Sequence, residues 1–357
     1  MTKPESTDPH GAEASTGHRR IQARSSYEGF RATIKAVGTG PRGARPLSFA
    51  EARSAMAAIL AGEVSDAQAG AFLIAMRIKG ETPEELAGLA QALRDAALPM
   101  YVNGGRPLVA CAGAYDGVAE APQLSLAAAL LAAAAGAGVV VHCGETLGPK
   151  RGVTAADVLG ALGGTARPRP DESGEMLARA GVAVVHAGEA LPGWRRLAAV
   201  RDEIGLRGPV HSAEKLVDYL GARRFVVGHT HGPYGARLCG ALALLDAERA
   251  VAVRGVEGSD VMRPGRPVAL EGEVTLELPE RLGDRLPEAA GAEASASLTR
   301  AVVEGDEDGV IAYAVALSAG LRLAVAGVAR DAVAGMDAAR AAVADGRAGH
   351  TLAALVG

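Results

Sequence analysis

Cysteine and lysine are both scarce in this sequence. Three cysteines occur in 357 residues, and none belongs to a Cys-x-x-Cys pair. An odd and widely spaced set does not suit a disulfide framework and favours a reducing compartment. No apolar segment of the kind that directs export occurs among the first residues, so we expect a cytoplasmic protein. Only five of the 37 basic residues are lysine, so an anion site here would depend largely on arginine.

Long uncharged hydrophobic runs are also missing, apart from one segment. Residues 124–141 carry no charge, and about twenty apolar residues span a bilayer. The run is rich in alanine, is interrupted by Ser125, Gly136 and Gly138, and lacks flanking aromatic residues, which argues against a membrane helix. With 49% hydrophobic residues and a net charge of −4, the composition predicts a globular protein without an overall attraction to nucleic acid.

Residues 107–164 alternate between strand and helix patterns. Short apolar runs at 108–111 and 139–141 are typical of buried strands, and the alanine- and leucine-rich block at 124–135 is typical of a helix. A β-α-β order implies parallel strands whose loops emerge at one edge of the sheet, where ligands bind. We therefore expect chemistry in the two loops that follow these strands. Their polar residues are Tyr115, Asp116, His142, Glu145, Lys150 and Arg151.

The same alternation continues toward the end of the chain. It predicts strands at 182–185, 225–228 and 250–253, a strand pair at 268–278, and helices at 193–204, 234–245, 309–323 and 330–344. The fold class is α/β, with a helical domain ahead of a larger mixed α/β domain whose central sheet is flanked by helices. We place a disordered tail at 1–26, the helical domain at 27–100, joined by a helix near 193–216, and the α/β domain at 101–357.

Three helix starts occur in a row between residues 48 and 93. Each is a capping box, with a hydroxyl at the N-cap and Glu or Gln three residues later. The pairs are Ser48 with Glu51, Ser65 with Gln68, and Thr82 with Glu85. Apolar residues follow at three- and four-residue spacing, so each helix has one apolar face. We expect a small helical bundle that serves packing or formation of a homodimer.

Segment 47–93 and the helical segment after residue 312 resemble the anthranilate phosphoribosyltransferase family, a group of glycosyltransferases with a nucleoside-phosphorylase-like fold. Between the two segments the order and spacing of elements also match, so the likeness covers about residues 27–357. The resemblance implies a helical domain hinged to a mixed α/β domain, a cleft between them, and a homodimer. It also implies a phosphoribosyl pyrophosphate site with Mg²⁺ as the cofactor.

The motifs of that site differ here from the family pattern. The GTGGD donor loop becomes residues 112–116, which keep Gly113 and Asp116; the NIST segment keeps only Ser125; and the KHGN strand end becomes 141–144. The paired magnesium acids become Ser259-Asp260-Val261. Together with segments 210–216, 229–234 and 254–260, these departures resemble a divergent second branch, which has no accepted transferase reaction and includes nucleic-acid binders.

Two kinds of ligand follow from this resemblance, a phosphorylated small molecule and single-stranded nucleic acid. For the first, the expected phosphate and donor contacts are Gly113, Asp116, Ser125, His142, Gly144, Lys150, Arg151, Arg201, Arg207 and Arg254, with Glu257 and Asp260 as magnesium ligands. For the second, they are Lys150, Arg151, Arg195, Arg196, Arg201, Arg223 and Arg224, with Trp194 and Tyr234 as stacking partners. A zinc site is a third hypothesis, built on His229 and His231 with His142, His186 and Cys143 at neighbouring strand ends.

Overall fold

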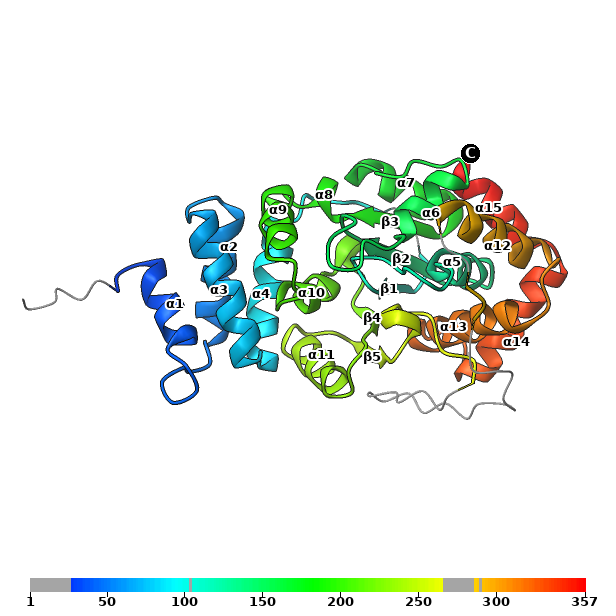
Figure 1. The fold of residues 1–357 in the computed structure, drawn as a ribbon. Helices are drawn as coiled ribbons and strands as arrows, with labels where there is room; N and C mark the ends of the chain where they lie inside the picture. The colour runs from blue at the N-terminus through cyan, green and yellow to red at the C-terminus, as the bar shows by residue number, and fades with distance from the viewer. Residues whose placement is uncertain (1–26, 103–104, 266–285, 289–290) are drawn as a thin grey trace, which may run out of the picture.

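The computed structural model describes residues 27–102, 105–265, 286–288 and 291–357. The predicted tail at 1–26 and the predicted strand pair at 268–278 lie outside the described residues. The described part of the chain begins with helices α1 (Phe30–Gly38), α2 (Phe49–Leu60), α3 (Asp66–Lys79) and α4 (Pro83–Ala96), which form a bundle at one end of the molecule (Figure 1).

The three predicted capping boxes begin α2, α3 and α4. In each, the N-cap hydroxyl accepts the N3 backbone N–H, and the N3 side chain accepts the N-cap backbone N–H. Such a box satisfies two backbone donors that the helix cannot pair internally. Glu85, which closes the third box, is fully buried and pairs with Lys79 at 2.7 Å. The starts of α2, α3 and α4 are therefore set by local side chains.

Five parallel strands form the central sheet in the order β3-β2-β1-β4-β5. They are β1 (Leu108–Ala112), β2 (Gly138–Cys143), β3 (Val182–His186), β4 (Arg224–Gly228) and β5 (Arg249–Val253), which confirms the strands predicted in these positions. His142 was expected in the loop after the second strand, but it lies within β2, opposite Ala112 of β1. The chain turns from one side of β1 to the other between β3 and β4. The loops after β1 and β4 therefore flank a topological switch point, the usual ligand position in such sheets.

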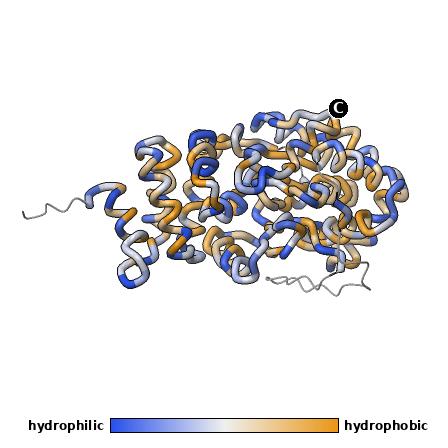
Figure 2. The backbone as a smooth tube through the Cα atoms, in the orientation of Figure 1, coloured by the Kyte–Doolittle hydropathy of each residue, from blue (hydrophilic) through white to orange (hydrophobic). Residues whose placement is uncertain are grey.

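Both faces of the sheet are covered, because alternate strand residues point in opposite directions. Val109 and Cys111 of β1 pack with α5 (Ser125–Ala134), α13 (Val310–Ala326) and α14 (Ala332–Ala344), while Ala110 and Ala112 belong to the apolar core that includes the helical bundle. Figure 2 shows apolar segments running through the centre of the molecule. The uncharged run at 124–141 forms the buried helix α5 and strand β2. Within the described residues, no helix is long and apolar enough to cross a membrane.

The predicted connecting helix near 193–216 is broken in two. The helix α9 (Trp194–Ile204) ends at Gly205, whose φ of 65° is left-handed, and the short helices α10 (Val210–Ala213) and η1 (Glu214–Leu216) follow Pro209. Glycine adopts that backbone conformation without the steric cost of a side chain. With α11 (Pro233–Leu244), these helices lie between the bundle and the sheet (Figure 1). The break puts segment 205–209 beside the carboxyl edge of the sheet.

The remaining helices complete the α/β domain. They are α6 (Ala155–Ala161), α7 (Pro170–Ala180), α8 (Ala187–Ala190), α12 (Ala292–Glu304) and α15 (Arg347–Val356), with the short turns η2 (Tyr219–Gly221) and η3 (Val256–Gly258). The helices predicted at 309–323 and 330–344 correspond to α13 and α14. The predicted fold class, an N-terminal helical bundle followed by a larger α/β domain, is confirmed.

Candidate functional site

A pocket of about 620 Å³ opens at the carboxyl edge of the sheet. Its walls come from the loops after β1, β2, β4 and β5, from segment 206–215, and from the end of α3 and the turn after it. It therefore lies between the helical bundle and the α/β domain, at the switch point between β1 and β4. Pockets with converging polar groups at this position are the usual binding sites of open α/β sheets.

Four cationic side chains line this pocket, together with three carboxylates. The cations are Arg77, Lys150, Arg207 and Lys215, and the carboxylates are Glu81, Asp116 and Glu257. The lining residues come from both parts of the molecule: Arg77 belongs to α3, and its Nη1 donates to the backbone carbonyl of Arg207. Tyr234 of α11 donates its hydroxyl hydrogen to Glu81 at 3.1 Å. These contacts hold the bundle against the rim of the pocket.

Asp116 and Arg207 form an ion pair across the pocket. The Nε and Nη2 atoms of Arg207 lie 2.8 and 2.6 Å from Oδ2 of Asp116. The carboxylate is 2% exposed, while the arginine side chain is 35% exposed. Asp116 is thus fixed in the wall, and the guanidinium group, with hydrogens left to donate, faces the open volume. An anion can reach Arg207 without breaking up the protein core.

Lys150 and Glu257 form a second pair in the pocket wall. The Nζ atom of Lys150 donates to the backbone carbonyl of Glu257 at 2.8 Å and lies 3.3 Å from its Oε2. Burial by itself would raise the pKa of Glu257, but three backbone N–H donors and Lys150 lower it overall. Glu257 is therefore a carboxylate at neutral pH.

Lys215 lies at the floor of the pocket and carries a perturbed amine. Its Nζ donates to the carbonyl of Gly228, at the end of β4, at 2.6 Å. Burial lowers the pKa of Lys215 to about 8, despite the opposing effect of Glu214 and Asp116. Amines with a pKa near the ambient pH exchange protons readily and can act as nucleophiles. Lys215 is a residue that the sequence did not single out.

Arg201 and Glu214 form a buried ion pair behind this lysine. The two Nη atoms of Arg201 lie 2.8 and 3.2 Å from the carboxylate oxygens of Glu214, and both side chains are at most 3% exposed. Burial raises the pKa of Glu214 to about 7, although Arg201 counteracts it. Arg201 was predicted to contact a phosphate, but it does not line the pocket. Its charge is used within the core.

His142 is also separated from the pocket. Its Nδ1 lies 2.5 Å from the hydroxyl oxygen of Tyr115, which donates to the carbonyl of Glu214 at 3.0 Å. Burial lowers the pKa of His142 to about 3, so the ring is neutral. Tyr115 fills the space between the donor-loop position and β2, and a Cβ on Gly144 would lie 2.8 Å from its ring. His142 and Gly144 therefore support Tyr115 and do not line the pocket.

Asp260 does not fit the magnesium role predicted for it. Its carboxylate pairs with Arg322 and accepts the hydroxyl hydrogen of Ser125, and all three side chains are at most 3% exposed. Gly113 packs directly against it, since an added Cβ would lie 3.0 Å from the Asp260 nitrogen. Among the described residues, no group of three or more His, Cys, Asp or Glu is placed to hold a metal ion, which also leaves the zinc hypothesis without a site. Asp260 anchors a core ion pair.

Two further predicted contacts are exposed residues outside the pocket. Arg151 forms a salt bridge with Asp202 at 2.8 Å, and its side chain is 61% exposed. Arg254 donates from Nε to the carbonyl of Thr230 at 3.2 Å. Of the twelve predicted site residues, the pocket is lined by four: Asp116, Lys150, Arg207 and Glu257. The other eight are Gly113, Ser125, His142, Gly144, Arg151, Arg201, Arg254 and Asp260.

Several residues that line the pocket were not predicted from the sequence, or were predicted to have another role. Arg77 and Glu81 were counted only as part of the helical bundle, because nothing in a helix pattern tells which end meets the other domain. His229, His231 and Tyr234 were considered for zinc or stacking, and they line the pocket without a metal cluster among the described residues. A useful signal was available in segment 210–216, where a lysine and a glutamate stand in an otherwise buried stretch. Charged residues are seldom buried without a partner.

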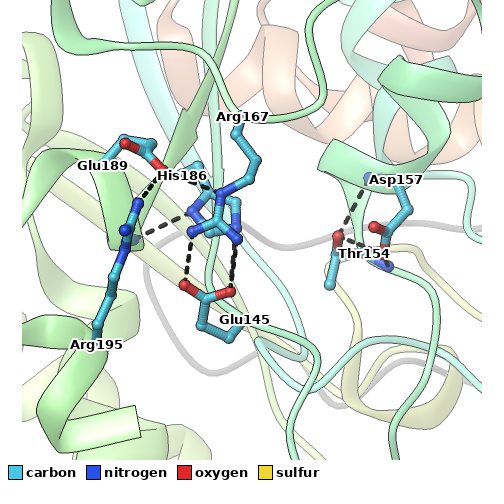
Figure 3. Close-up of polar contacts among 8 residues, drawn as sticks. Glu145, Thr154, Asp157, Arg167, His186, Glu189 and Arg195 are labelled. Carbon is cyan, nitrogen blue, oxygen red and sulfur yellow. Dashed lines mark hydrogen bonds and ion pairs between the residues drawn. The ribbon is translucent and has the colours of Figure 1, made fainter.

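A second polar cluster lies at the carboxyl ends of β2 and β3 (Figure 3). Arg167 binds both carboxylate oxygens of Glu145 at 2.8 and 3.0 Å, and its Nε donates to Glu189 at 3.0 Å. Arg195 also donates to Glu189, at 2.8 Å, while Nδ1 of His186 accepts the backbone N–H of Gly188 at 3.1 Å. Two cations and two carboxylates neutralise one another, so this cluster ties α9 to the loop after β2 and leaves no unmatched charge.

The basic residues considered for nucleic acid are likewise paired. Arg196 binds Asp66 at 2.8 Å, Arg224 lies 3.2 Å from Glu248, and Arg223 donates to the carbonyl of Asp246. Trp194, the expected stacking residue, is completely buried. Lys150 and Arg207 are paired as well, so pairing alone does not set the pocket apart. What sets it apart is that four cations from α3, the loop after β2 and segment 206–215 line one volume.

Comparison with known proteins adds the following. Residues 31–97 match the model of the helical bundle domain of a glycosyl transferase family, and residues 116–349 match the model of its α/β domain. An anthranilate phosphoribosyltransferase of Thermus thermophilus is 35% identical over 305 residues, covering 84% of this chain and 91% of the relative. One from Methylorubrum extorquens strain PA1 is 32% identical over 342 residues, covering 92% and 98%.

Solved structures give the same picture. The chain is similar to the crystal structure of an anthranilate phosphoribosyltransferase from Thermus thermophilus, with a TM-score of 0.78 and 32% identity, covering 91% of this chain and 98% of that one. The Saccharomyces cerevisiae protein in complex with PRPP and Mg has a TM-score of 0.75 at 16% identity, covering 91% and 95%, which is a likeness of fold alone.

Proposed function

Since the chain belongs to the anthranilate phosphoribosyltransferase family of glycosyl transferases, we propose that it binds a phosphate-bearing ligand in the pocket between its helical bundle and its α/β domain. The observation that carries this proposal is the convergence of Arg77, Lys150, Arg207 and Lys215 on one pocket of about 620 Å³. Clefts whose lining carries a net positive charge concentrate anionic ligands. Arginine and lysine together provide the donors that phosphate oxygens require.

The contacts of these cations determine how each one is placed for a ligand. Arg207 is held at one edge by Asp116 and keeps its remaining N–H groups for a ligand. Lys150 and Lys215 are each anchored by a backbone carbonyl, so their charges are positioned before a ligand arrives. Donors fixed in advance lose little side-chain entropy on binding. The pocket is therefore suited to a compact anion such as a phosphoryl or diphosphoryl group.

We propose further that transfer of a phosphoribosyl group to anthranilate is weak or absent. In the family that the sequence resembles, backbone N–H groups of the GTGGD loop hold the pyrophosphate, and paired acids hold magnesium. Here Tyr115 fills the loop position, and Asp260 is engaged by Arg322 in the core. A loop that carries a buried tyrosine leaves little room for close backbone approach to phosphate. The eroded donor site is the reason to expect binding without robust catalysis.

Calorimetric titration tests the binding proposal. Phosphoribosyl pyrophosphate and pyrophosphate are titrated into the parent protein and into Arg207→Gln, with Arg151→Gln as the matched control. Hydrogen bonds to charged groups contribute about 1.5–3 kcal/mol, so Arg207→Gln should weaken binding by about 10- to 100-fold. Arg151 lies outside the pocket, so its variant should bind as the parent does. Absence of binding to the parent at low salt would refute the proposal, as would equal loss in both variants.

Single-stranded nucleic acid is the alternative ligand, and the same titration distinguishes it. An oligonucleotide that neutralises several cations should lose affinity steeply as salt rises, with a slope set by the number of phosphate contacts. Arg195, Arg196 and Arg224 do not line the pocket on which the other cations converge, which favours the small ligand. Binding of the oligonucleotide with a steep salt slope, without binding of pyrophosphate, would select the alternative.

A further inference from the structure

The carboxylate of Glu257 occupies a concave group of backbone donors beside the pocket. The N–H group of Ala119 lies 3.0 Å from Oε2, and those of Glu120 and Ala121 lie 2.9 and 2.8 Å from Oε1. Lys150 completes the ring of donors, 3.3 Å from Oε2. Three successive N–H groups that converge in this way form an anion-binding nest. Here the anion in the nest is a side chain of the protein itself.

The backbone of Glu257 is bent to deliver this carboxylate. Its φ is 50°, in the left-handed region, and the next residue, Gly258, has a φ of 81°. A Cβ on Gly258 would lie 2.5 Å from Oγ1 of Thr230. Non-glycine residues adopt positive φ only where the surroundings hold them there. The contacts with Lys150 and the nest hold the side chain of Glu257, and the N–H groups of Gly258 and Ser259, which donate to the carbonyls of Gly255 and Val256, hold the turn.

From these contacts we infer that the nest at residues 119–121, together with Lys150, is a binding site for one terminal phosphoryl group, which takes the place of the Glu257 carboxylate. This inference rests on the proposed function, because it names the part of the pocket that receives the phosphate. A phosphoryl group offers three acceptor oxygens and about two negative charges, against two oxygens and one charge for a carboxylate. It can satisfy all three N–H groups and the ammonium group of Lys150 together.

Solvent reaches the ion pair of Lys150 and Glu257, so a phosphoryl group can replace the Glu257 carboxylate there. The side chains of Lys150 and Glu257 are 15% and 21% exposed, and both line the pocket. Residues 119 and 120 lie at the surface. The carboxylates of Glu214 and Asp260 are also paired with cations, but they are at most 1% exposed and have no route to solvent. Of these three ion pairs, the one at Glu257 can therefore release its carboxylate to water when another anion arrives.

The number of donors in the nest favours a terminal phosphoryl group over a phosphodiester. A phosphodiester in a nucleic acid has two free oxygens and one charge, whereas a terminal phosphoryl group offers three oxygens to the three N–H groups and the ammonium group of Lys150. Inorganic phosphate and pyrophosphate are therefore the probes, and an oligothymidylate is the comparison. Binding of the oligonucleotide alone would assign the cations to a backbone and overturn the inference.

The test removes the internal carboxylate. Glu257→Gln keeps the size of the side chain but not its charge, and Glu257→Ala empties the nest; Glu203→Gln removes the charge of an exposed residue of α9 as the matched control. Affinity for pyrophosphate, measured by calorimetry, should rise by about tenfold in both Glu257 variants, equivalent to about 1.4 kcal/mol, and stay at the parent value in the control. Lys150→Ala should lower it. Circular dichroism of each variant verifies the fold.

The outcomes separate the inference from the proposed function. Binding to the parent that is unchanged or weaker in both Glu257 variants would overturn the inference and leave the proposed function standing, since Glu257 would then be a scaffold of the loop. Binding that appears only in the Glu257 variants would overturn the proposed function for the parent protein, while still assigning the nest as a phosphate site that Glu257 blocks. Loss of binding in every form, parent and variants, would overturn both.

Discussion

Replacing Asp260 with alanine separates a core ion pair from a magnesium site. Arg322 is completely buried, and Asp260 is its only carboxylate among the described residues. Removing one partner leaves an uncompensated charge in a medium of low dielectric constant, which costs about 3–5 kcal/mol. With an unfolding entropy of about 2.1 cal/mol/K per residue, a chain of 357 residues loses about 1.3 °C per kcal/mol, so the melting temperature of Asp260→Ala should fall by about 4–7 °C.

Two controls make the result specific. Asp345→Ala breaks an ion pair with Arg347 in which both side chains are about half exposed, and the melting temperature should not change. The double variant Asp260→Leu with Arg322→Met replaces both charges by apolar groups and should recover most of the lost stability. The assay is thermal unfolding followed by circular dichroism, with and without Mg²⁺. A parent that Mg²⁺ stabilises, and an Asp260→Ala variant that melts with the metal-free parent, would refute the core assignment.

Three further predictions concern activity, ionisation and assembly. The chain should fail to complement a tryptophan auxotroph that lacks anthranilate phosphoribosyltransferase, because its donor loop and acidic pair are altered; robust growth would contradict this. Folding lowers the pKa of Lys215 to about 8, so between that pH and about 10.5 the unfolded chain binds one more proton than the folded chain. The free energy of unfolding should therefore rise with pH through this window in the parent and not in Lys215→Met. Identical pH profiles of that free energy, measured by denaturant unfolding, would exclude the shift. We also predict a homodimer formed by the helical bundle, where Ile78 is 79% exposed. Sedimentation should give a dimer for the parent and a monomer for Ile78→Asp, and a monomeric parent at micromolar concentration would count against it.

The elements of the fold could be predicted because their signals are local. A capping box such as Ser48 with Glu51 contains both its donor and its acceptor within four residues, and the strand pattern at Val139 to Val141 follows from β-branched side chains in a short run. The helix predicted at 193–204 ends before Gly205, whose left-handed backbone caps α9 locally. The separate short helices after Pro209 were not predicted, because the connection near 193–216 was expected as one helix.

The site could be predicted only in part, because its members depend on distant partners. Asp116 and Lys150 were found from their positions after strands, which is where parallel sheets bind ligands. Arg201 and Arg207 were both predicted to contact phosphate, but Glu214 neutralises Arg201 in the core while Arg207 lines the pocket. His142 precedes a loop, yet Tyr115 from the neighbouring loop covers it. A side chain from another element buries some residues at strand ends and leaves others exposed. The spacing of residues in the sequence does not tell which of them are buried.

The central claim is that the pocket between bundle and sheet binds phosphate-like anions, and the most direct test is to locate such an anion. Crystals grown with tungstate, a heavy analogue of phosphate, reveal its position by anomalous scattering. We expect a tungstate ion in contact with Lys150 and Arg207, beside the N–H groups of residues 119–121, and no ion there in Arg207→Gln combined with Lys150→Ala. Ordered tungstate only at other surfaces, with an empty pocket at an anion concentration that saturates the protein in solution, would contradict it.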